Sequence, residues 1–489
     1  MYVNRRDFLR NSICAALGGA GLYSASGTLR LIAAAAAATP RRIAFTDYKA
    51  LVCIYLYGGN DSFNTVVPYD ATYYPIYQGS RQGIALGQSA IQANNLSPLA
   101  ASGGLPGGVP SDGGSYGLHP AMPELRGLFN SGKAAIVANV GSLLYPITQA
   151  QYQNGTVPTP GQLFSHDDQT TQWQTSRADD ANANGWGGRI ADLLYGSNAG
   201  PTPMSISLSG ANRFQRGAIV NQYAVDPGGA AADASGGTNP SFSIAGMDYR
   251  GDGPESWVIG NNPDGLAAYS ALVASGTQTH VLERAFADSA NRALGNAAAL
   301  NGALTGVTLS TPFPNTDLGN QLAAVALMIK VRATLGMSRQ VFFVSTGNYD
   351  THSDQITNQQ GNLRDLSQAL AAFYAATIEI GVADGVTAFT SSDFGRSLSV
   401  NSTGTDHGWG GHHVVIGGGV RGQRFYGAMP SLTSNANPDD TGYGQIIPTL
   451  AVDQYVATLA SWFGVDAGGI ANILPNLGRF DSPNLRFMG

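Results

Sequence analysis

Several short stretches of this sequence place aspartate or histidine beside glycine, and most of them follow an apolar run. They are Gly58-Gly59-Asn60-Asp61, Leu118-His119-Pro120, Phe164-Ser165-His166-Asp167, Tyr349-Asp350-Thr351-His352, Ser392-Asp393-Phe394-Gly395-Arg396 and Asp406-His407-Gly408. Carboxylate oxygens and imidazole nitrogens, with no thiolate among them, suit zinc, manganese, magnesium or calcium. The stretches lie far apart in the chain, so only a fold that gathers the ends of many strands would bring them together.

Spacing suggests how these side chains would share metal ions. Asp350 and His352 are two positions apart, so an extended segment turns both side chains to the same side, where they can hold one ion. Asp61 and Asp393 can hold a second ion, with His407 completing either shell. Two ions about 3.5–4 Å apart stabilise the attacking and leaving oxygens of a displacement. For any one of these carboxylates alone, a capping or salt-bridge role is the alternative.

Ser165 is the candidate nucleophile, because it precedes a helical stretch whose free N–H groups would favour an anion. A bound metal would lower the pKa of its hydroxyl. The alternative is a helix N-cap, with Asp168 three positions later as an imperfect capping box. His166 is a ligand, a proton carrier or a packing residue. Arg396 can bind an oxyanion through two N–H groups or pair with an acid at the surface.

The other histidines, and two further aspartates of these stretches, have different expected roles. The residues concerned are Asp167 and Asp406 as caps or ion pairs, His119 as a structural residue before proline, His280 as a solvated side chain, and His412 and His413, of which one should face the site.

The N-terminus has the pattern of an export signal. Arg5-Arg6 is followed by an apolar pair, an uncharged stretch and the alanine run Ala33–Ala38, which is the order of a signal peptide with cleavage near Ala38. The paired arginines resemble a twin-arginine signal, which implies the twin-arginine export machinery as a partner and a periplasmic or secreted location. A membrane anchor is the alternative. Residues 1–38 are therefore set apart from the fold.

Composition narrows the class of protein. The formal net charge is −6 and 12% of residues are charged, with no basic stripe, so nucleic acid is not expected as a partner. Cys14 lies in the signal, which leaves Cys53 as a buried small hydrophobe and excludes an internal disulfide. We expect residues 45–489 to form one domain, with a loop-rich insertion around 210–265.

Strands and helices alternate along the chain. Apolar runs predict strands at 51–57, 134–140, 204–208, 340–345, 386–391 and 413–416, and apolar periodicity predicts helices from His119-Pro120 to 131 and over 268–305, 318–335, 363–380 and 452–463. Residues 80–117 are predicted to be a long loop. This alternation indicates a mostly parallel sheet covered on both faces, a three-layer α/β/α sandwich. Ligands bind outside the carboxyl ends of such strands, where Asp61, Asp350 and Asp393 fall.

Six motifs in this order resemble the domain of unknown function 1501 family, from about Lys49 to the C-terminus. The resemblance implies an alkaline-phosphatase-like fold, with metal ions near carboxyl strand ends and a nucleophile at a helix start. Carried onto this chain, it implies Asp61, Asp350, His352, Asp393 and His407 as metal ligands and Ser165 as nucleophile. The Asp350-x-His352 spacing is shorter than usual in that superfamily, and Phe394 stands where a phosphatase often has histidine.

These observations lead us to expect an exported metal-dependent hydrolase of phosphate or sulfate esters, acting on an anionic ester substrate. Zinc is the expected ion, with manganese, magnesium or calcium as alternatives. Ser165 would attack, Arg396 would steady the anion and His166 would assist. The alternative is an exported binding or assembly protein that keeps the fold without catalysis and has an exported protein partner.

Overall fold

The computed structural model describes residues 44–101, 104, 106–228, 243–244, 279–434 and 436–489. The chain divides into two compact units, and the larger one, Ile43–Phe242 with Ala298–Gly489, carries every candidate site residue. The expected signal peptide, residues 1–38, and most of the expected insertion lie outside the described residues. In the described part of the chain, no helix is both long and apolar enough to cross a bilayer.

A mostly parallel sheet forms the centre of the larger unit. Its strands lie in the order β13 (Phe425–Tyr426), β4 (Ala134–Gly141), β12 (Gly411–Gly417), β9 (Val386–Ser392), β1 (Lys49–Leu56), β8 (Arg339–Thr346), β5 (Ser205–Ser207) and β6 (Tyr223–Asp226), with β14 (Leu450–Ala451) beside β4. β1 pairs in parallel with both β8 and β9, whereas β12 is antiparallel to β4 and β9. β1 is buried on both faces, which is why it reads as one continuous apolar run.

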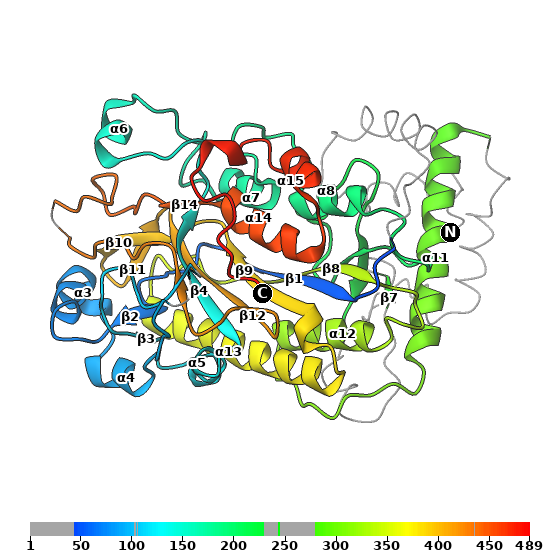
Figure 1. The fold of residues 1–489 in the computed structure, drawn as a ribbon, viewed down its shortest axis with the longest axis horizontal. Coiled ribbons are helices and arrows are strands. Elements are labelled where there is room, and N and C mark those ends of the chain that lie inside the picture. Colours follow the sequence, from blue (N-terminus) through cyan, green and yellow to red (C-terminus); the bar gives the residue numbers. More distant parts are fainter. Residues whose placement is uncertain (1–43, 102–103, 105, 229–242, 245–278, 435) are drawn as a thin grey trace, which may run out of the picture. The chain divides into compact units, whose positions relative to one another are not determined.

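Helices cover both faces of this sheet (Figure 1). One layer contains α7 (His166–Thr175), α8 (Trp186–Leu193), α14 (Val452–Phe463) and α15 (Ala467–Ile473). The other contains α5 (Pro123–Asn130), α12 (Asp317–Lys330) and α13 (Gln355–Glu379). The predicted three-layer α/β/α sandwich with a mostly parallel sheet is confirmed.

Smaller elements gather around β10 and β11, at the left of Figure 1. They are the hairpin β10 (Arg396–Asn401) and β11 (Gly404–His407), the pair β2 (Val66–Pro68) and β3 (Tyr116–Leu118), and the helices α3 (Tyr74–Arg81), α4 (Gln88–Ala93) and α6 (Gln149–Asn154). The prediction of an unbroken loop over 80–117 is wrong, because α4 and a short 3₁₀ turn, Gln82–Ile84, lie within it. Further 3₁₀ turns are Ala383–Gly385 and Leu477–Arg479. The remaining elements are α11 (Val281–Leu304) and β7 (Ser243–Ile244).

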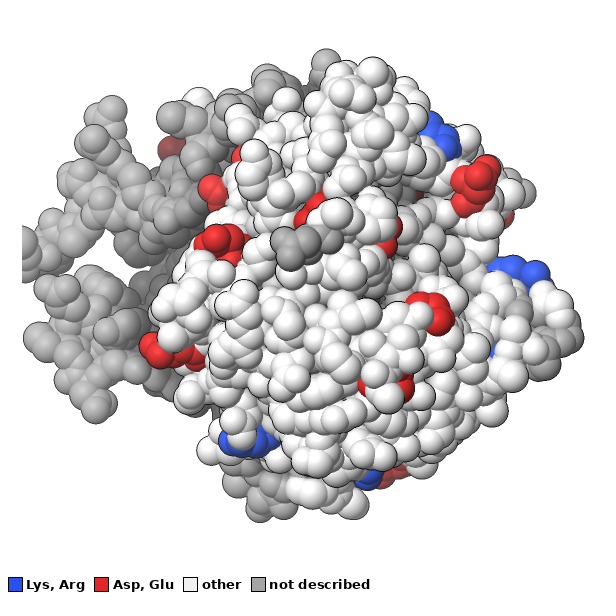
Figure 2. Space-filling model, turned by 90° about the vertical axis from the view of Figure 1, so that its left-hand side faces the viewer, with Lys and Arg blue, Asp and Glu red and all other residues white. Residues whose placement is uncertain are grey.

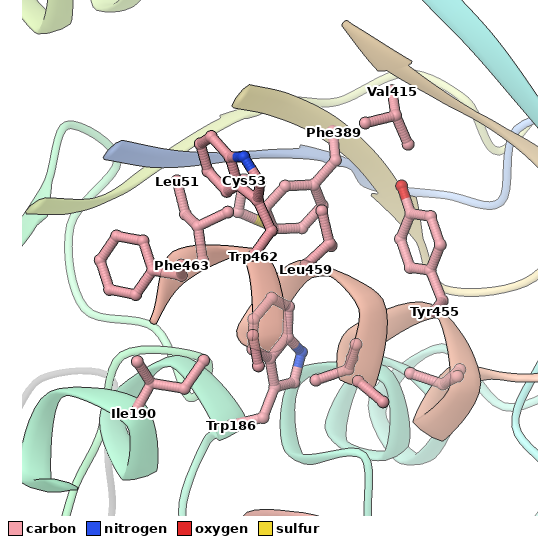
Figure 3. Close-up of a cluster of buried hydrophobic side chains, with 14 of the residues drawn as sticks. Leu51, Cys53, Trp186, Ile190, Phe389, Val415, Tyr455, Leu459, Trp462 and Phe463 are labelled. Carbon is pink, nitrogen blue, oxygen red and sulfur yellow. The ribbon is translucent and has the colours of Figure 1, made fainter. Parts of the chain in front are cut away.

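The core between the sheet and α14 holds the sheet in place beneath the site. Leu51 and Cys53 of β1 and Phe389 of β9 face Leu459 and Phe463 of α14 (Figure 3). Each fully buried side chain of this size contributes about 1.5–3 kcal/mol by leaving water. Burial raises the pKa of the Cys53 thiol, so this residue behaves as the predicted small hydrophobe.

Candidate metal centre

The candidate residues approach one another beyond the carboxyl ends of β1, β8 and β9. Asp350 and His352 follow β8, Asp393 follows β9, and the backbone of Gly58 just after β1 lies directly against Asp350. A Cβ atom on Gly58, whose φ is +112°, would overlap the backbone of Asp350. Glycine is therefore required at this position, both for its left-handed conformation and for the close approach.

Three imidazoles and one carboxylate form a compact cluster. Ligand atoms of His166, Asp350 and His407 all lie within 4.8 Å of one another. His352 joins them, because its Nε2 is 3.0 Å from Asp350 Oδ1 and 3.0 Å from His407 Nε2. Nε2 of His407 is 3.4 Å and Nε2 of His166 is 3.6 Å from the Asp350 carboxylate. All three Nε2 atoms thus surround Asp350.

The outer nitrogen of each imidazole contacts an oxygen that can only accept a hydrogen bond. Nδ1 of His166 is 2.7 Å from Asp393 Oδ2, and Nδ1 of His352 is 3.2 Å from Asp406 Oδ1. Nδ1 of His407 is 2.7 Å from the carbonyl oxygen of Phe164. Each contact places the proton on Nδ1, which leaves the Nε2 lone pair of a neutral imidazole facing the cluster. Metal-binding histidines in proteins are oriented in this way.

Arg396 holds the carboxylate in place. Its guanidinium is fully buried and donates to Asp350 Oδ1 at 2.6 Å, to the Gly58 carbonyl at 3.0 Å and to Thr405. With its donors occupied inside the protein, Arg396 is not free to bind a substrate. The expected oxyanion role is therefore corrected: Arg396 orients Asp350.

Contacts within the cluster and burial shift the pKa values of Asp350, His166 and His407. Burial alone would raise the pKa of Asp350, but Arg396 and the imidazoles of His352 and His166 outweigh it and lower that pKa below its usual value. The hydrogen bond to Asp393 raises the pKa of His166. Burial lowers the pKa of His407, which favours its neutral form.

The Phe394 ring packs against two imidazoles of the cluster. Its ring centroid lies 4.9 Å from that of His166 and 4.8 Å from that of His407. The ring fits because residue 59 is glycine, whose φ is +82°, since a Cβ atom there would overlap Phe394. The backbone of Phe164, which accepts from His407, has a φ of 71°, an uncommon value for a residue with a side chain. Such conformations concentrate at functional sites.

Asp61 does not join the cluster, contrary to its expected role as a ligand. Its Oδ1 accepts from the Phe63 N–H at 3.0 Å, and its Oδ2 contacts Arg81 and Gln355. The side chain is fully buried, and both carboxylate oxygens accept from protein donors. Asp393 is also displaced from the expected arrangement, because it lies behind His166. The expected pairing of Asp61 with Asp393 around a second ion is therefore not formed.

Ser165 is the N-cap residue of α7, directly before His166. Its hydroxyl donates to Asp168 Oδ2 at 2.7 Å and caps no backbone N–H. This contact has features of both expectations, since Ser165 occupies the cap position yet pairs with a carboxylate that can accept its proton.

The remaining histidines do not contact the cluster in the described part of the chain. His119, His412 and His413 are buried, and burial lowers their pKa values to about 4, 4 and 3. His280 is exposed at the start of α11. Sequence reasoning missed Asp406 and the Phe164 carbonyl as orienting groups. The adjacency of Asp406 and His407 is the one signal that pointed to Asp406.

Comparison with known proteins gives low similarities to solved structures. The match to the crystal structure of Ps i-CgsB in complex with k-i-k-neocarrahexaose has 9% sequence identity and a TM-score of 0.31, and it covers 90% of this chain and 78% of the other. The match to the PsFucS1 sulfatase from Pseudoalteromonas sp. has 8% identity and a TM-score of 0.28, and it covers 96% of this chain and 75% of the other. The match to a mutant of alkaline phosphatase PafA has 12% identity and a TM-score of 0.25, and it covers 73% of this chain and 64% of the other. The fold assignment given above depends on the sheet topology of this chain itself.

No curated protein matches the chain. Residues 265–454 match the family model described as "Protein of unknown function (DUF1501)". The matched segment includes Asp350, His352, Asp393, Arg396 and His407, which belong to three of the six motifs that carry the resemblance.

Proposed function

We propose that the protein is an exported hydrolase of phosphate or sulfate esters that depends on one divalent metal ion held by His166, Asp350, His352 and His407. The observation that carries this proposal is the common orientation of the three imidazoles. Each is anchored through Nδ1, and each presents Nε2 to the same carboxylate. A cluster with only a packing role would not need all three rings to be oriented alike.

The donor set fits the proposed ion. Three nitrogens and a carboxylate oxygen, without thiolate, match zinc best and also accept manganese. When bound, such an ion acts as a Lewis acid on an ester oxygen and lowers the pKa of a bound hydroxyl. Arg396 keeps the Asp350 carboxylate ionised and fixed, so that the site is organised before an ion enters.

Ser165 is the proposed nucleophile because it directly precedes the ligand His166 and begins α7. Asp168 already accepts the hydrogen bond of its hydroxyl, so a proton acceptor is in place when the oxygen attacks. The N–H groups in the first turn of an α-helix have no partner within the helix, so the start of α7 would favour the negative charge that develops on an attacked ester. Ser165→Ala should therefore lose turnover and retain metal.

Metal analysis combined with an ester assay tests the function. The mature chain is purified without added chelator, its metal content is measured, and hydrolysis of 4-nitrophenyl phosphate and 4-nitrophenyl sulfate is followed. One equivalent of metal and activity sensitive to EDTA are expected. Asp350→Asn should lose both, whereas Asp481→Asn, an exposed carboxylate outside the cluster, should lose neither. A protein that binds no divalent ion, or whose hydrolysis is indifferent to Asp350→Asn, contradicts the proposal.

Export through the twin-arginine machinery is proposed from Arg5-Arg6 and the alanine run that follows. This route carries folded proteins, which suits a chain that acquires its ion before leaving the cytoplasm. Replacing both arginines by lysine should retain the full-length chain in the cytoplasmic fraction. Export that is unchanged in the Arg5→Lys, Arg6→Lys double variant would exclude this route.

A further inference from the structure

A cavity lies between the N-terminal half of α13, the approach to α5 and the start of α4. Its volume is about 430 Å³, within the range of small-molecule sites. It is lined by Leu86, Gly87, Ala90, His119, Pro120, Ala121, Pro123, Glu124, Ile356, Gln360, Arg364 and Gln368. None of these belongs to the metal centre. The cavity does include His119 and Pro120, from the motif that the metal centre leaves unused.

The imidazole of His119 has a fixed orientation and a fixed tautomer. Its backbone N–H donates to the Thr65 carbonyl at 2.9 Å, and its carbonyl accepts from Asn94 at 2.8 Å. The Ala121 N–H donates to Nδ1 at 3.0 Å, so the ring proton must sit on Nε2. The side chain is 4% exposed, and Nε2–H has no partner among the described residues. His119 therefore offers the cavity a rigid donor.

Arg364 offers a positive charge without a protein partner. It lies on α13 in one stripe with Ile356 and Gln360, at i, i+4 and i+8, and all three line the cavity. Within the part of the chain that the structure describes, its guanidinium has no hydrogen bond and no ion pair. Glu124 is the other charge of the lining, and its carboxylate is engaged by the Ser367 hydroxyl at 2.7 Å.

This combination of groups favours one class of ligand. A carboxylate can accept from the Arg364 guanidinium and from His119 Nε2–H, which are both donors. Glu124 in the same lining would repel a dianion such as phosphate more strongly than a monoanion. Leu86, Ile356 and the prolines supply apolar surface for the rest of the molecule.

We propose that this cavity is a binding site for a small monocarboxylate with an apolar tail. The carboxylate is held by Arg364 and His119, and the tail packs on Leu86 and Ile356. The site is separate from the metal centre and does not depend on the proposed hydrolase function.

Calorimetric titration of the full-length protein with benzoate and with hexanoate tests the site. We expect one molecule bound per chain and a dissociation constant at least about tenfold weaker in Arg364→Gln, the loss typical of a charge-assisted hydrogen bond. Arg486→Gln removes an equal charge from an exposed position elsewhere and should leave binding unchanged. His119→Asn keeps an acceptor for the Ala121 N–H but removes the Nε2 donor, and should also weaken binding.

The proposal is overturned if neither acid binds at 10 mM, if Arg364→Gln binds them with the same affinity as the parent protein, or if inorganic phosphate binds more tightly than benzoate. Binding that disappears in Asp350→Asn would place the acid at the metal centre and would also reject the cavity. Thermal unfolding checks each variant, and Arg364→Gln decides alone if His119→Asn does not fold, because Arg364 is exposed.

Discussion

Asp393 acts through His166. Its Oδ2 lies 2.7 Å from Nδ1 of that imidazole and accepts from the Gly58 N–H at 2.9 Å, while the side chain is 3% exposed. An asparagine at this position can still offer its oxygen to the Gly58 N–H and to the Nδ1–H of His166, but a neutral amide accepts the hydrogen bond from Nδ1 more weakly than a carboxylate does. The ring of His166 would be oriented less firmly, and its Nε2 would be a weaker metal ligand.

Asp393→Asn should therefore weaken metal affinity by about 10–100-fold while leaving all four proposed ligands in place. Competition with a chromophoric chelator measures this affinity. Asp481→Asn, which changes an exposed carboxylate in the same way, is the control. Equal affinities of Asp393→Asn and the parent protein would mean that the hydrogen bond to His166 does not orient a ligand.

Asp453 predicts a pH dependence of stability away from the site. Burial in α14 raises its pKa to about 7, although Arg189 lies near, and Oδ1 has no hydrogen-bond partner among the described residues. An unfolded aspartate has a pKa of about 3.9, so the folded protein binds the proton more tightly. Its contribution to stability is complete below about pH 4 and is lost as pH rises through 7.

Asp453→Asn has no carboxyl group to ionise, so this variant should not lose that stability as the pH rises. The free energy of unfolding of the variant, relative to the parent, should rise between pH 5 and pH 8 by a few kcal/mol, since one pKa unit corresponds to about 1.4 kcal/mol. Urea unfolding at the two pH values measures the difference. A variant whose relative stability is the same at both pH values would show that the carboxyl does not titrate in this range.

Elements buried on both faces are the ones that the sequence predicts well. β1, β4, β8 and β9 each lie within one residue or two of their predicted ends, because a central parallel strand needs an unbroken apolar run. The start of α13 was predicted eight residues late, at 363 instead of Gln355. Its first turns bury Gln355 and Gln359 against Asp61, and a buried polar face gives no apolar periodicity.

In the site, too, the sequence predicted some features and missed others. Sequence identified residue types at strand ends, and the structure brings Asp350, His352 and His407 together there. The sequence did not predict the ion pair between Arg81 and Asp61, because Arg81 lies in a stretch that was expected to be a loop. An ion pair between residues 20 positions apart depends on how α3 packs, which no local pattern reveals.

The close contact between Gly59 and the Phe394 ring predicts that a larger residue at position 59 disturbs the site. Gly59→Ala would drive a Cβ atom into the Phe394 ring at a φ of +82°, and this ring packs on His166 and His407. The variant should unfold at a lower temperature and bind metal more weakly. Gly361→Ala is the matched control, because Gly361 lies in α13 with no atom within 4 Å of the added Cβ. It should stabilise the protein by about 0.5–1 kcal/mol. Equal effects of the two changes would contradict this account of Phe394.

At the scale of the larger unit, the face drawn in Figure 2 has little positive charge to attract an anion. Figure 2 shows the side that lies at the left of Figure 1 as mostly uncharged in its described part, with scattered Asp and Glu and few Lys and Arg side chains. Recognition of an anionic ester would therefore depend on short-range contacts with a bound ion, because electrostatic steering needs an extended patch of one sign.

A bound ion would also tie the larger unit together. The four proposed ligands come from the start of α7, the loop after β8 and the end of β11, segments that are distant in sequence. An ion that binds only the folded state stabilises it by RT ln(1 + [M]/Kd), about 2.7 kcal/mol at a free concentration one hundred times Kd. Removing the ion with EDTA should therefore lower the midpoint of thermal unfolding, and zinc returned in excess of the chelator should restore it. Asp350→Asn should unfold at the same temperature with and without EDTA. An equal EDTA effect on that variant would place the stabilising ion elsewhere in the protein, and no effect on the parent would show that these four side chains hold no ion.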